Sequence, residues 1–207
     1  MDIFDKNKFI LKGFRIGIVN SLKIVSGGLR DALYPTYDYF RWSSNIKIFS
    51  KVPGKKKKAI IYIEENRDLL NVYDVVDIES QERIGVIRYH FGSWEILDDD
   101  DNYFKIAPTE NIIKEMFFLK HILYDIIVDK TNKPMGAIKK ISPFFAPVFY
   151  KYQVDFSLDE ENILDKRLAL ATLTLFVYAH ERFVSTERTK YFLRSKVLKL
   201  VDKHSLR

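Results

Sequence analysis

LALATLTLFVYA, residues 168–179, is the stretch that decides the fold. It predicts a helix with no polar face, since its only hydroxyls belong to two threonines that can bond back to the preceding turn. Such a helix has to be surrounded on every side, and a sheet rolled around it can do this where a flat sheet cannot. A coiled coil is disfavoured because no heptad is sustained, and a membrane span because the run is too short.

The strand that precedes this helix alternates strictly. Its apolar residues Tyr152, Val154, Phe156 and Leu158 are expected to face one way, with the polar residues between them facing the other. Ser157 and Glu160 then form a capping-box pair, which predicts the start of the helical region.

Further upstream, residues 45–158 consist of short apolar runs separated by turn residues, a pattern typical of antiparallel hairpins. Two hairpins are alike, because YDVVD and IGVIR at 73–77 and 84–88 recur as YDIIVD and MGAIK at 124–129 and 135–139. In both copies Tyr and Gly are 12 residues apart, and the copies are 51 residues apart. The glycine beside a branched apolar residue predicts a bulge or a close backbone approach.

The two ends of the chain have patterns of their own. Residues 1–42 are predicted to form an N-terminal extension that is helical, although its glycines and the alternation of Ile16, Ile18 and Ile24 leave a strand open. Residues 185–207 are basic and amphipathic, which predicts a final helix on the outside of the domain. The helical seam of the N-terminal segment consists of Leu11, Phe14, Ile18, Leu22, Val25, Leu29 and Leu33.

The fold class predicted from these patterns is α+β and mainly β. A closed antiparallel β-barrel over residues 43–184 is expected to wrap around the central hydrophobic C-terminal helix. The N-terminal extension and the basic helix are expected to lie outside this barrel.

This order of motifs resembles the tubby-like C-terminal domain, whose superfamily includes the phospholipid scramblases and the LURP-one-related proteins. The likeness covers residues 45–182 and is carried by the two hairpins, by WEILD at 94–98, by YQVDF at 152–156 and by the apolar helix. The resemblance implies the barrel fold and a role in binding anionic lipid or protein. Lipid scrambling is not carried over, because the chain has no cysteine to palmitoylate and the acidic run from Asp98 to Asp101 fails the EF-hand pattern.

The chain is basic, with 34 Lys and Arg against 28 Asp and Glu and a formal net charge of +6, which suits anionic partners. The densest positive charge is a predicted hairpin tip, although a solvated loop would have the same composition. A second basic group follows the two repeat glycines. The predicted lipid- or anion-binding residues are Lys51, Lys55, Lys56, Lys57 and Lys58 at the tip, with Arg88, Lys139 and Lys140 in the second group.

The sequence predicts no catalytic residue, no metal site and no cofactor. It has no nucleophile elbow, no phosphate-binding glycine loop and no metal-ligand spacing among its four histidines. Clustered carboxylates from Asp98 to Asp101 could hold a cation, but a solvated turn explains them as well.

The expected function is therefore that of a non-enzymatic domain that binds an anionic phospholipid surface or a protein partner. Two alternatives stay open: a nucleic-acid-binding protein using the same basic surfaces, and a homo-oligomeric interaction module. The first residues lack the pattern of a signal peptide, so a cytoplasmic location with contact to a membrane surface is expected.

Overall fold

A computed structural model gives the structure of two compact units, residues 1–172 and 173–207, and each is treated by itself. The described residues are 3–16, 19–27, 32–37, 45–51, 54, 56–66, 68–69, 71–90, 93–100, 102–108, 123–128, 131, 133–142 and 149–179.

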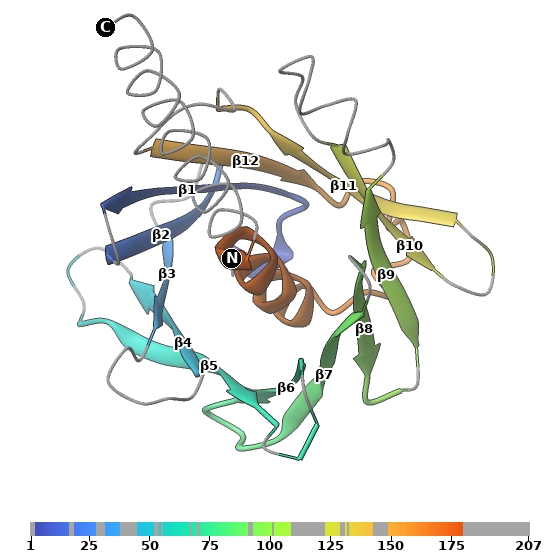
Figure 1. Cartoon of the computed structure of the whole chain (residues 1–207), viewed down its shortest axis with the longest axis horizontal. Coiled ribbons are helices and arrows are strands. Elements are labelled where there is room, and N and C mark those ends of the chain that lie inside the picture. The colour runs from blue at the N-terminus through green and yellow to red at the C-terminus, as the bar shows by residue number, and fades with distance from the viewer. Residues whose placement is uncertain are drawn as a thin grey trace, which may run out of the picture. The chain divides into compact units, whose positions relative to one another are not determined.

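The first unit is mostly one antiparallel sheet (Figure 1). A short 3-10 helix, Ile3–Asp5, precedes the strands. The strands are β1 (Lys8–Ile16), β2 (Val19–Ser26), β3 (Ala32–Tyr37), β4 (Ile46–Lys51), β5 (Lys58–Glu65), β6 (Val72–Asp77), β7 (Arg83–His90), β8 (Ser93–Asp98), β9 (Tyr103–Pro108), β10 (Leu123–Val128), β11 (Lys133–Lys140) and β12 (Phe149–Asp155).

Each strand pairs with its neighbours in sequence, and β1 pairs with both β2 and β12, so the strand order returns to its first strand. Side chains alternate between the two faces. In β12, for example, Tyr150, Tyr152 and Val154 are buried while the residues between them are exposed or half-buried. One face of the sheet therefore encloses the core and the other meets solvent.

The predicted fold class was wrong about which residues make the sheet. It assigned a closed barrel to residues 43–184, but the strands of that range, β4 to β12, do not close on themselves: β4 pairs with β3 and β5, and β12 with β11 and β1. Residues 1–42, predicted as a helical extension, instead contribute β1, β2 and β3. The predicted basic helix, residues 185–207, lies outside the described residues.

The N-terminal segment is extended because its burial follows a period of two. Phe9 and Leu11 in β1, and Leu22 and Ile24 in β2, are at most 2% exposed. Gly13, which would weaken a helix, fits a strand here, since a Cβ at this position would overlap the Ser21 carbonyl oxygen and lie 2.5 Å from the Tyr150 ring. Alternation and the glycine therefore outweigh the spacings of three and four that predicted a helix.

The apolar helix runs through residues 166–179. Within the first unit its residues Leu168 to Thr172 are all 0% exposed. Five consecutive residues point in every direction around a helix of 3.6 residues per turn, so this part is enclosed on all sides. The Thr172 hydroxyl donates a hydrogen bond to the Leu168 carbonyl oxygen at 2.9 Å, so this buried donor is satisfied within the helix itself.

The predicted glycine bulges are confirmed. The ladder between β6 and β7 shifts register just after the pair Val75–Gly85, and that between β10 and β11 shifts just after Ile126–Gly136. A Cβ on Gly85 would lie 2.5 Å from the Leu97 carbonyl oxygen and 2.7 Å from Leu168 Cδ2. The repeat glycine of β7 thus lets the helix approach the sheet closely.

The close approach predicts that Gly85→Ala destabilises the protein by on the order of 1–3 kcal/mol, because the added methyl group meets backbone that cannot move aside. The matched control is Gly27→Ala, where a Cβ meets nothing within 4 Å. Urea unfolding followed by circular dichroism measures both variants. Equal unfolding free energies for the two would contradict the role of Gly85.

Candidate functional site

The structure brings most of the predicted lysine tip together at one end of the sheet. Lys51 ends β4, Lys58 begins β5, and Lys56 and Lys57 precede β5; all four are exposed. Lys58 forms an exposed ion pair with Glu79 at 2.7 Å, which reduces the net positive charge of the tip. Lys55 lies outside the described residues.

The second predicted group does not join the tip. Arg88 and Lys139 are exposed near the ends of β7 and β11, which in antiparallel order is the end of the sheet opposite the tip. Three strands, β8 to β10, separate them from each other. Lys140 is 3% exposed, with its Nζ 5.4 Å from the centre of the Tyr152 ring, so it does not present its charge to solvent.

A different group of lysines forms a row on the outer face of β2, β1 and β12. Lys12 in β1 is directly opposite Lys23 in β2 and directly opposite Lys151 in β12. Adjacent strands are about 4.8 Å apart, so the three Cα atoms span about 10 Å. We call Lys23, Lys12 and Lys151 the lysine row.

The lysine row is bordered by two exposed aromatic side chains. Phe14 and Phe149 are directly opposite each other, two residues along β1 and β12 from the lysines. Phe14 is 36% exposed and Phe149 is 70% exposed. We call this pair the aromatic row.

A surface hollow of about 510 Å³ lies across both rows. Its lining contains three lysines, two serines and three aromatic rings, and no Asp or Glu. None of the three lysines forms an ion pair with any part of the chain that the structure describes. The lining residues are Lys12, Gly13, Phe14, Ser21, Lys23, Ser142, Phe149, Tyr150 and Lys151.

The lysine row also continues toward the predicted tip. Lys23 Nζ is 5.5 Å from the centre of the Tyr34 ring in β3, and Lys57 Nζ is 4.5 Å from the same ring centre. Both ammonium groups are within cation–π range of one ring. Of the residues predicted from the sequence, Lys57 is thus linked to the lysine row.

Sequence reasoning missed the lysine row as a site, although each member carries a signal. Lys12, Lys23 and Lys151 are each flanked on both sides by small or apolar residues in a strand, which places a lysine on the outer face. The assignment of residues 1–42 to a helix hid this alternation. Only the pairing of β1 with both β2 and β12 shows that the three share a row.

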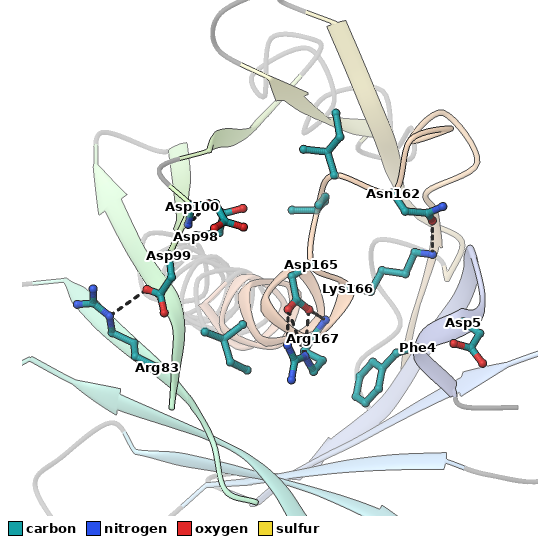
Figure 2. A pocket seen from close by; sticks show the side chains of 13 residues that line it. Phe4, Asp5, Arg83, Asp98, Asp99, Asp100, Asn162, Asp165, Lys166 and Arg167 are labelled. Carbon is teal, nitrogen blue, oxygen red and sulfur yellow. Dashed lines mark hydrogen bonds and ion pairs between the residues drawn. The ribbon is translucent and has the colours of Figure 1, made fainter. Parts of the chain in front are cut away.

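A second, larger hollow of about 850 Å³ lies where the chain enters the helix (Figure 2). Its charged side chains mostly neutralise one another: Arg83 Nε is 3.2 Å from Asp99, and Arg167 is 2.7 Å from Asp165. The Asp98 carboxylate accepts hydrogen bonds from the backbone of Asp100 and from Asn102. Among the described residues no group of three or more His, Asp or Glu is placed to hold a metal ion, and Asp101 lies outside them.

Arg167 also ties the start of the helix to the sheet, through a 2.8 Å ion pair with Asp77 at the end of β6. Burial opposes ionisation of Asp77, but hydrogen bonds from the Glu79 and Ser80 backbone and from Arg167 outweigh it and hold the pKa of this carboxyl below its ordinary value. The pKa of Arg167 is raised, chiefly by its hydrogen bond to Asp165.

No protein-family model matches the chain, and neither the curated protein sequences nor the solved structures gave a match. The resemblance to the tubby-like domain therefore stays a prediction. Among the described residues, no helix has both the length and the apolar character required to cross a membrane.

The lowered pKa of Asp77 predicts a pH-dependent loss of stability in Asp77→Asn. Above the ordinary carboxyl pKa of 3.8 the variant should be less stable than the wild type. The difference should vanish as the pH falls through the lower pKa of the folded state, because the wild-type carboxyl group is then protonated and uncharged, like the Asn side chain of the variant. Urea midpoints between pH 7 and pH 2 measure this, with Glu82→Gln in the same turn as the control. A constant difference across that range would contradict the ion-pair explanation.

Proposed function

We propose that this protein is a non-enzymatic binding domain that docks on an anionic membrane surface through the lysine row. The observation that carries the proposal is the direct opposition of Lys23, Lys12 and Lys151 across three adjacent strands, on a face whose hollow has no carboxylate. Like charges directly opposite in a sheet cost stability, so this row is unfavourable for folding alone. Contact with an anionic partner would offset that cost.

A lipid surface fits the row better than a single small anion does. The three lysines extend from strands whose Cα atoms span about 10 Å, which is suited to several phosphate groups in a plane. Each lysine near an anionic leaflet contributes about 1 kcal/mol, so the row supplies about 3 kcal/mol of attraction. Because the cytoplasmic leaflet carries the anionic lipids, we place the protein in the cytoplasm, peripheral at that surface.

The resemblance to the tubby-like domain implies the same class of partner and supports the proposal without deciding it. Exposed Phe149 beside lysines is also an arrangement that stacks unpaired nucleobases, so single-stranded nucleic acid is the second candidate. The first candidate requires an anionic membrane and the second requires single-stranded nucleic acid, and one series of variants distinguishes them.

The test replaces the lysine row, as Lys12→Gln, Lys23→Gln and Lys151→Gln together. At low salt we expect binding to phosphatidylserine-containing vesicles to fall about a hundredfold, because about 3 kcal/mol of attraction is removed. The variant should unfold at the same urea concentration as the wild type or higher, since repulsion within the row is relieved. Vesicle co-sedimentation at several lipid concentrations measures the affinity.

The matched control replaces Lys51, Lys56 and Lys58 at the tip with Gln, so that both variants lower the formal net charge from +6 to +3. We expect the control to retain most of the binding. Equal losses would mean that net charge alone matters, and a larger loss in the control would favour the tip. Binding to single-stranded RNA, with none to anionic vesicles, would replace the proposal with the second candidate.

A further inference from the structure

The position of the aromatic row relative to the lysine row gives the proposed membrane contact an orientation. Along β1 and β12 the outward-facing residues change in a fixed order from one end of the sheet to the other. Phe14 and Phe149 come first, then Lys12 and Lys151, then the uncharged pair of Ile10 and Gln153. The last pair, Lys8 and Asp155, forms an ion pair at 3.3 Å. Along the strands, an apolar row is thus followed by a positively charged row and then by rows without net charge.

The spacing of these rows matches the layers of a membrane interface. Rows two residues apart on a strand are separated by about 7 Å. Interfacial elements bury their apolar side chains about 5–10 Å into the boundary between headgroups and acyl chains. With the aromatic row at that boundary, the lysine row lies at the level of the phosphate groups.

Burial of the two rings in a membrane would also remove apolar surface that is unfavourably exposed to water. Phe149 is 70% exposed, which makes it the most exposed large apolar side chain among the described residues. Its exposed neighbour Phe14 belongs to the same hollow, so the two present one apolar surface. By sequence alone, the residues just before Phe149, at 143–148, are also apolar, PFFAPV; they lie outside the described residues.

We infer that Phe149 and Phe14 insert into the interfacial layer of an anionic membrane while the lysine row binds the phosphates above them. This inference rests on the proposed function and adds an orientation to it. The end of β12 that begins at Phe149 faces the bilayer, and the end followed by Leu158 faces away.

Single labels at the two ends of β12 test the orientation directly. The chain has no cysteine, so Phe149→Cys and Leu158→Cys each carry one spin label at a known place. The two sites are matched, because both native side chains are exposed, at 70% and 50%, and they lie at opposite ends of one strand, Phe149 at the start of β12 and Leu158 after its end. Power saturation with oxygen and with a water-soluble nickel complex reports whether each label is in lipid or in water, on phosphatidylserine-containing vesicles.

We expect the label at residue 149 to become accessible to oxygen and protected from nickel when vesicles are added. The label at residue 158 should stay in water. A water-exposed label at residue 149 on bound protein, or a label at residue 158 in lipid, would overturn the inference. Protection of residue 149 by single-stranded RNA without lipid would overturn it too.

Phe149→Ser supplies an independent measurement with a variant that is expected to fold, since most of this side chain is exposed. Its affinity for anionic vesicles should fall about tenfold, the loss of one partly buried ring, with the salt dependence unchanged. An unchanged affinity, with the lysine-row variant still impaired, would refute insertion and leave the proposed function standing. Absence of vesicle binding by the wild type would remove both.

Discussion

The rest of the structure depends on the burial of a helix that has no polar face. Residues Leu168 to Thr172 are fully buried, and five successive positions cannot all be covered from one side. The sheet meets this requirement by approaching the helix closely, and Gly85 is the position where the approach is visible, since Leu168 occupies the space of its missing side chain. A glycine that would weaken an ordinary strand is favourable here because it lets a large side chain pack against the backbone.

The same requirement explains why the N-terminal segment is part of the sheet. The strands from β4 to β12 leave two outer strands without partners, and β1, β2 and β3 pair with them and with one another. Their inward residues complete the apolar lining, as the full burial of Leu11 and Ile24 shows. The outward residues of β1 then lie beside those of β12, so that Lys12 and Lys151, far apart in the sequence, become direct neighbours. The candidate site is thus a consequence of how the core is enclosed.

Much of the sheet could be predicted from local patterns, because a strand with one buried face alternates with period two. β12 and the two glycine hairpins were recognised in this way, down to the bulges at Gly85 and Gly136. The N-terminal segment could not, because its apolar residues satisfy helical and extended spacings at once and only their pairing decides between them. The lysine row was out of reach for the same reason: a run such as Lys55–Lys58 is visible along the chain, whereas a row across strands depends on register.

The contrast between two pairs on β1 and β12 is the strongest argument that the lysine row serves binding. At one register position these strands place Lys8 opposite Asp155, which form an ion pair. Four register positions further along, on the same face, they place Lys12 opposite Lys151, and β2 adds Lys23 on the other side. The strands can therefore accommodate an acidic residue opposite a lysine, yet the row has three lysines and a hollow without a carboxylate. A solvated face needs only scattered charge for solubility. A row of positive charges beside exposed phenylalanines is better explained by a partner that has an anionic layer next to an apolar one.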